Sequence, residues 1–314
     1  MSFFINSTEE YHRNQLNSLG WELTLCNALY PGNTPLRRLL KQNDSYGHLL
    51  YDFLQRFIPM DNIMKIIEIG GGYGYLMKDF LDRNSHILPC MLDISPFLLE
   101  KQKEILKESQ AWYVEADLLD IDSAFLEGYE LAILNENLGD FPTLVDIKVE
   151  EIKSLQSSPD EHLMQLFYIF EKYDLFSDLS ESKLLNVNIG AIKALEKLCK
   201  AGIAFIFLSE HSCEAQVPDY LSPFVNILSS GNPERIALKG HDEYSLKFSY
   251  LEKIAGTFGY ISSRGNFIDF IKINITDTIK YILSSQSRYN DEDEIVCHFI
   301  EDLCKYEYLI LQKP

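Results

Sequence analysis

Short apolar runs alternate with helical patterns through the middle of the chain. Five runs have the length and apolar composition of buried strands, at residues 63–69, 87–92, 112–114, 131–134 and 203–208. Apolar residues at helical spacing separate them, as at residues 75–82 and 96–108. Strands that alternate with helices in this way predict a parallel sheet with right-handed crossovers.

The flanking regions follow other patterns. Residues 1–62 are predicted to form an N-terminal helical region, in which the spacing at 46–57 indicates a helix. Residues 63–314 then form a Rossmann-like domain, interrupted at about 146–200 by a helical insertion rich in Leu, Glu, Lys and Ser. We expect a loop after residue 208, a helix at 250–258, and late strands at 260–273 and 308–312, antiparallel at one edge. The acidic run at 291–294 is interpreted as a solvated helix start.

The main chemical signal follows the first strand, where Glu68 precedes a turn containing Gly70, Gly71, Gly72 and Gly74. Glycines let the backbone turn sharply and approach a ligand closely, and amides at a helix start suit a polar group. The spacing is not the Gly-x-Gly-x-x-Gly of dinucleotide sites, and no Gly-Lys-Ser/Thr follows it. A carboxylate beside the turn would repel a pyrophosphate but attract a cationic ligand.

Polar residues also follow the next strands of the predicted sheet. Asp93 stands 19 residues after Gly74 and suits the two hydroxyls of a ribose. Asp117 follows the third strand, where a carboxylate can accept a hydrogen bond from an adenine amine, and Asn135 and Glu136 follow the fourth. Ligands bind at the carboxyl ends of strands in open α/β sheets, so these residues are expected to share one site.

These motifs together resemble the class I S-adenosylmethionine-dependent methyltransferases. The resemblance covers residues 46–140 and implies a mainly parallel seven-stranded sheet with helices on both faces. It also implies S-adenosylmethionine as cofactor, with the methionine moiety at the glycine turn, the ribose at Asp93 and adenine after the third strand. The implied cofactor-binding residues are Glu68, Gly70, Gly71, Gly72, Gly74, Asp93, Ile94, Asp117, Leu118 and Asn135.

A closer similarity is to the MidA family of protein arginine methyltransferases, which is linked to mitochondrial complex I assembly. It is carried by Gly47-His48-Leu49, Ser95-Pro96 and Asn135-Glu136-x-x-x-Asp140-x-Pro142, with Gly240-His241 before a later helix. The chain departs from that family at Ser209-Glu210-His211, where a turn similar to Asp-Tyr-Gly is usual. The resemblance implies transfer to a protein arginine. A small-molecule acceptor and a non-catalytic assembly role are the alternatives.

Methyl transfer needs an aligned nucleophile and, for an amine, removal of a proton. Glu136 is the candidate guanidinium clamp, since one carboxylate can hold two guanidinium nitrogens, and Asp140 is a second candidate. Glu136 could instead be a capping or ion-pair carboxylate at the end of its strand. His241 and His211 are candidate bases near neutral pH.

The net charge restricts the expected binding partners, and the cysteine spacing restricts the expected metal content and location. The formal net charge of −19, from 28 basic and 47 acidic residues, argues against a nucleic-acid substrate and favours a basic protein segment. The six cysteines lack the spacing of a zinc site or a disulfide framework, so we expect no metal and a cytoplasmic location. No membrane span is expected, and a homodimer remains open.

Overall fold

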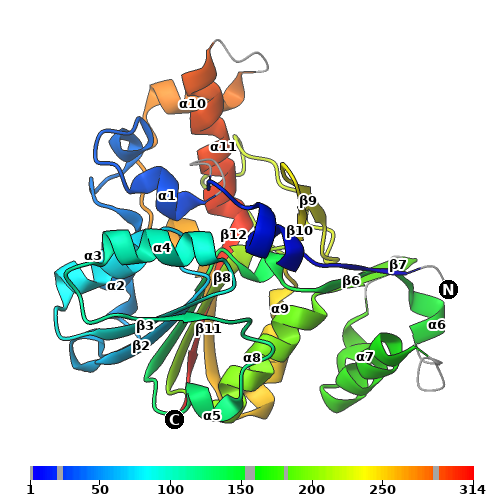
Figure 1. The fold of residues 1–314 in the computed structure, drawn as a ribbon. Coiled ribbons are helices and arrows are strands. Elements are labelled where there is room, and N and C mark those ends of the chain that lie inside the picture. The colour runs from blue at the N-terminus through cyan, green and yellow to red at the C-terminus, as the bar shows by residue number, and fades with distance from the viewer. Residues whose placement is uncertain (1–2, 20–23, 153–159, 180–182, 286–289) are drawn as a thin grey trace.

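The computed structural model describes residues 3–19, 24–152, 160–179, 183–285 and 290–314. Its centre is a seven-stranded sheet flanked by helices (Figure 1). The strands are β2 (Lys65–Ile69), β3 (Leu88–Asp93), β4 (Trp112–Glu115), β5 (Leu131–Asn135), β8 (Phe205–His211), β11 (Ile261–Asn266) and β12 (Tyr306–Gln312). Their order is β11-β12-β8-β5-β2-β3-β4, and only β12 runs antiparallel to its neighbours. The predicted fold class is confirmed.

Apolar residues on both faces of the strands divide the core in two. Ile66 packs into one core and Ile67 into the other, because successive strand residues point to opposite faces. The first core is covered by α1 (Leu25–Leu29), α2 (Tyr46–Leu54), α3 (Tyr75–Arg83), α4 (Pro96–Ile105), α10 (Asp277–Ser284) and α11 (Asp291–Lys305). The second is covered by α5 (Ser123–Leu126), α6 (Val149–Ile152), α7 (Glu161–Lys172), α8 (Ile189–Ala201) and α9 (Phe248–Thr257).

Helix starts follow local capping chemistry. Ser95 accepts a hydrogen bond from the Leu98 amide, and Pro96 occupies the first turn of α4, where its missing N–H costs nothing. Asn290 caps α11 in the same way, and the acidic run 291–294 forms the first turn of that helix. The interpretation of this run as a helix start is confirmed. No helix of the described residues is long and apolar enough to span a membrane.

Some flanking elements differ from the expectations. The insertion contributes strands as well as helices, since β6 (Thr143–Lys148) pairs with β1 (Phe4–Asn6) and with β7 (Leu184–Val187) in a separate antiparallel sheet. The predicted loop contains the hairpin β9 (Arg235–Ala237) and β10 (Asp242–Tyr244). The N-terminal region is only partly helical, and the late strand predicted at 260–273 already ends at Asn266. β1 and β6 pair across more than 130 residues, so local pattern does not reveal that pairing, whereas β9 and β10 are only three residues each.

The central strand β5 offers a test of the packing. Leu134 is fully buried, and Leu134→Ala should lower the free energy of unfolding by about 2–5 kcal/mol because it leaves a cavity between sheet and helices. Leu228→Ala is the matched control, since Leu228 is 85% exposed. Urea unfolding followed by circular dichroism measures both changes. Equal stabilities of the two variants would contradict the described core.

Candidate active site

A cleft of about 1310 Å³, partly open to solvent, lies at the carboxyl ends of the parallel strands. The glycine turn and the segments after β3, β4 and β5 form one side of it. Residues 7–19 and 24–27 contribute much of the opposite wall, which the sequence analysis did not anticipate.

The glycine turn has the conformation that its composition predicts. Gly70, Gly72 and Gly74 have φ values of +64°, +53° and +85°, which residues with a side chain rarely adopt. Gly71 is required for space instead, because a Cβ there would lie 2.7 Å from the Met91 methyl carbon and 2.9 Å from Glu68 Cδ. Gly70, Gly71 and Gly72 line the cleft, whereas Gly74 stands outside it as the cap of α3.

Two acidic residues lie buried beneath the turn. Burial, with a further contribution from Asp93, raises the pKa of Glu68 to about 8. Among the described residues, Oε2 of Glu68 has no hydrogen-bond partner. Asp93 accepts hydrogen bonds from the Ser95 amide and from Gln102 Nε2, both at 2.9 Å, and burial raises its pKa to about 6. Gln102 also donates to the Gly72 carbonyl at 3.0 Å, which ties Asp93 to the glycine turn.

The segments after β3, β4 and β5 bring the remaining predicted residues to the same cleft. Ile94, Asp117, Leu118 and Asn135 all line it. Asp117 accepts a hydrogen bond from the Leu119 amide at 2.7 Å, and burial raises its pKa. The Asn135 amide is held by Tyr46, Ser209 and Glu136.

Glu136 lines the cleft with an unusual backbone, since its φ is +52°. Its carboxylate accepts hydrogen bonds from the Leu25 amide at 2.7 Å and the Cys26 amide at 3.3 Å, at the start of α1. Burial raises the pKa of Glu136 to about 8. The geometry therefore shows the helix-anchoring arrangement that was the alternative to a guanidinium clamp, and the clamp stays a prediction.

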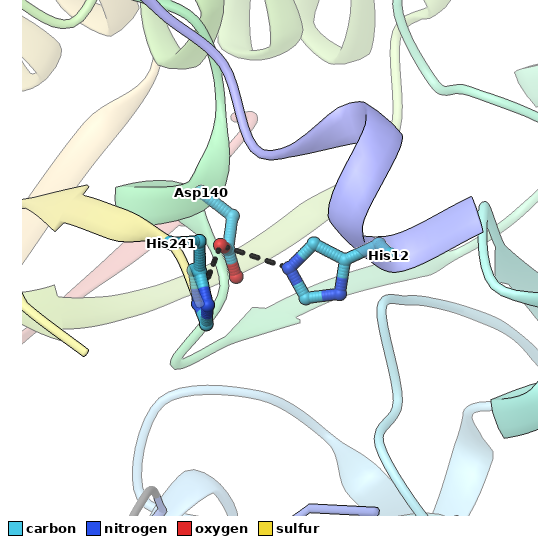
Figure 2. A group of neighbouring side chains, drawn as sticks. All are labelled: His12, Asp140 and His241. Atoms are coloured by element: carbon cyan, nitrogen blue, oxygen red, sulfur yellow. Dashed lines mark hydrogen bonds and ion pairs between the residues drawn. The ribbon is translucent and has the colours of Figure 1, made fainter. Parts of the chain in front are cut away.

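Asp140 lies between two imidazoles at the rim of the cleft (Figure 2). Its Oδ1 is 2.9 Å from Nε2 of His12 and 3.7 Å from Nε2 of His241. Nε2 of His241 also lies 3.1 Å from Oε1 of Glu243. Burial lowers the pKa of His241; burial acts the same way on His12, but the Asp140 carboxylate outweighs it and raises the pKa of that imidazole.

Four residues of the site were not found from the sequence: His12, Asn137, Gln102 and Glu243. Asn137 reaches over the glycine turn and donates to the Ile69 carbonyl. Only the position of Asn137, directly after Asn135-Glu136, could have marked it. His211, the other candidate base, does not line the cleft and stacks on Tyr306 with ring centroids 3.8 Å apart.

The residues at this edge fit a cationic nucleoside cofactor. Among the described residues, one buried carboxyl oxygen of Glu68 has no partner and is well suited to a positive group. Gly70, Gly71 and Gly72 line the cleft without side chains, so a ligand can approach their backbone closely. Glu68 and the glycine turn would hold the methionine part of S-adenosylmethionine, Asp93 its ribose, and Asp117 with Leu118 its adenine. When bound, the cofactor supplies an activated methyl group.

Comparison with known proteins agrees with this geometry. Residues 47–151, about a third of the chain, match the family described as "Putative S-adenosyl-L-methionine-dependent methyltransferase". None of the curated proteins matches the chain.

Solved structures are similar to this chain at low identity, and two of them share its fold. An uncharacterized protein from Burkholderia thailandensis is 12% identical with a TM-score of 0.55, over 97% of this chain and 86% of that one. A second member of its superfamily from that organism, bound to S-adenosyl-homocysteine, is 13% identical with a TM-score of 0.50, over 85% and 76%. An O-methyltransferase family protein from Burkholderia thailandensis has a TM-score of 0.43 at 11% identity, over 84% of this chain and only 55% of its own length.

The predicted enzyme class and cofactor are confirmed over residues 47–151, which match a family of putative S-adenosylmethionine-dependent methyltransferases. The fold places the cleft where that class binds its cofactor, at the carboxyl ends of β2, β3 and β4.

Gly71→Ala tests the glycine turn. The added Cβ would push against Glu68 and Met91, so we expect the cofactor dissociation constant to rise at least about tenfold, or 1.4 kcal/mol. Gly256→Ala is the control, because a Cβ on that α9 glycine meets nothing within 4 Å. Isothermal titration with S-adenosylmethionine measures both. An unchanged affinity in Gly71→Ala would show that the cofactor does not use this turn.

Glu68→Gln tests the buried carboxyl. Because the pKa of Glu68 is about 8 in the folded protein and near 4.5 when unfolded, its stabilising contribution is complete below pH 4.5 and is lost as the pH rises through 8. The wild type should therefore lose up to about 5 kcal/mol relative to Glu68→Gln between pH 4.5 and 8.5. Urea unfolding of the ligand-free proteins across this range measures the difference. Parallel pH profiles would contradict the raised pKa.

Proposed function

We propose that the chain transfers a methyl group to a guanidinium nitrogen of a protein arginine. The observation that carries the proposal is the charge of the cleft. None of its described lining residues is Lys or Arg, and seven are acidic: Glu9, Glu68, Asp93, Asp117, Glu136, Asp140 and Glu243. Opposite charges attract strongly where water is partly excluded, so this lining favours a cationic acceptor over a neutral or anionic one.

The acceptor end of the cleft lies beyond β5, where Glu136, Asp140 and Glu243 gather near the expected methyl donor. A planar guanidinium offers N–H groups in a fork that matches carboxylate oxygens. Asp140 and Glu243 come from different elements, so two carboxylates can approach such a group from two directions. Holding the nitrogen in line with the methyl group is the main task left to the protein.

Two further observations support a basic protein as the acceptor. The net charge of −19 attracts basic partners over distance and repels nucleic acid. The segment from Asn135 to Pro142 also resembles the corresponding segment of the MidA family of protein arginine methyltransferases.

A small-molecule acceptor is the second candidate, favoured by the wall that residues 7–19 and 24–27 place along the cleft. A small-molecule acceptor predicts that the helical insertion at about 146–200 encloses such a pocket. Within the described parts of residues 146–200, however, no residue lines the cleft. An enclosed site would therefore depend on the N-terminal segment instead.

The test is a transfer assay with radiolabelled S-adenosylmethionine and the purified full chain. The acceptors are lysate proteins from cells lacking the enzyme and a deproteinised small-molecule fraction. Label in protein that appears as methylarginine after hydrolysis supports the proposal. Label only in the small-molecule fraction overturns it in favour of the second candidate.

Removing carboxylate charge at the acceptor end should lower turnover more than it weakens cofactor binding. We expect Asp140→Asn and Glu243→Gln each to lower kcat/KM for a basic protein acceptor at least about tenfold, with the cofactor dissociation constant within about twofold of the wild type. Glu127→Gln removes an exposed carboxylate far from the cleft and is the matched control. Loss of activity only through weaker cofactor binding would contradict the assignment.

A further inference from the structure

The cluster in Figure 2 joins two imidazoles and a carboxylate from three distant parts of the chain. His12 lies on a short π-helical turn (Tyr11–Gln15), Asp140 on a 3-10 turn (Leu138–Asp140), and His241 immediately precedes β10. Glu243 adds a second carboxylate next to His241. We propose that these four residues form a binding site for a divalent transition-metal ion.

The distances between the side-chain atoms suit shared coordination. Atoms bound at about 2.0–2.2 Å to one ion lie roughly 2.9–3.5 Å apart at octahedral or tetrahedral angles. The distances from Asp140 Oδ1 to His12 Nε2 and from His241 Nε2 to Glu243 Oε1 are 2.9 and 3.1 Å. The distance from Asp140 Oδ1 to His241 Nε2 is 3.7 Å, and one atom from each of His12, Asp140 and His241 falls within 4.8 Å of the others. Small side-chain rotations would bring the atoms of His12, Asp140 and His241 to one ion, and Glu243 would join them from beside His241.

The surroundings hold these side chains in place. The His241 ring stacks on Tyr11, with centroids 4.2 Å apart and an interplanar angle of 23°. The Asp140 carbonyl accepts a hydrogen bond from the Thr8 hydroxyl at 3.0 Å. Side chains that are already positioned lose less entropy when they bind an ion. Imidazole nitrogen with carboxylate oxygen suits Zn²⁺, Mn²⁺ or Fe²⁺, whereas Mg²⁺ prefers oxygen ligands and retains its waters.

Metal binding would have a consequence for catalysis that rests on the proposed function. Asp140 and Glu243 also serve the cationic acceptor in that proposal, so an ion bound to them would exclude a guanidinium by occupying its partners and by repulsion. The metal-bound form would then retain cofactor binding but transfer methyl groups slowly. The bound ion would thus inhibit methyl transfer, and removal of the ion would restore activity.

The experiment titrates ZnCl₂, MnCl₂ and MgCl₂ separately into the chelator-treated full chain by calorimetry. We expect one equivalent of Zn²⁺ or Mn²⁺ to bind at least about tenfold more tightly than Mg²⁺. His12→Gln keeps a polar side chain opposite Asp140 but removes a good ligand, so it should weaken binding at least about tenfold, as should His241→Ala. His86→Ala, at an exposed histidine outside the cluster, is the control.

Cofactor affinity, measured on the same variants, shows that each remains folded. Unchanged binding of Zn²⁺ and Mn²⁺ in both His12→Gln and His241→Ala would overturn the site. A second histidine–carboxylate cluster consists of His48, Asp79 and Asp82. Loss of metal binding in His48→Ala instead would also overturn the proposal. Calorimetry needs no acceptor, so failure of the arginine proposal does not affect this result. The effect on catalysis is tested separately: Zn²⁺ should inhibit methyl transfer, and a chelator should reverse the inhibition.

Discussion

Buried and partly buried carboxylates at the carboxyl ends of the strands are the constraint that shapes this protein. A carboxylate removed from water needs hydrogen-bond donors or a positive charge, because desolvation strongly penalises the ionised form. Glu210 obtains donors from the amides of Gly139 and His211, and Glu136 from the first amides of α1. These bonds attach the loop after β5 and the N-terminal region to the sheet. The hydrogen bonds that these buried carboxylates accept therefore help to position the segments that line the cleft.

Glu68 differs from these residues because its environment leaves one oxygen without a partner among the described residues. Asp93, close enough to influence its pKa, adds a second acid on the same side of the turn. A cationic cofactor would provide at this position what backbone amides provide elsewhere. With a pKa of about 8, Glu68 is largely protonated at neutral pH in the ligand-free protein, and a bound cation would favour its ionised form. Protonation of Glu68 would thereby couple folding stability to cofactor affinity.

The site residues that could be predicted from the sequence are those whose place is determined by a neighbouring strand. Glu68, Gly70–Gly72, Asp93 and Asp117 each lie within a few residues of the carboxyl end of a strand, and a parallel sheet brings these ends together. His12 and Asp140 are 128 residues apart, and no local pattern marks His12 as a member of the site. The same reason explains why the pairing of β1 with β6 was missed. For Glu136, the sequence left two chemical roles open. The bonds to the amides of α1 show the anchoring role, and the guanidinium clamp stays a prediction.

The pairing of β1 with β6 has a dynamic consequence. Only three residues of β1 are paired, and the segment that follows it contributes to the wall of the cleft. Peeling this strand away would break few hydrogen bonds and would leave the seven-stranded sheet intact, so it belongs to the least costly openings available to the fold. Exchange of spent cofactor for fresh could then proceed through local unfolding of the amino-terminal segment, at a rate set by that opening rather than by movement between rigid domains.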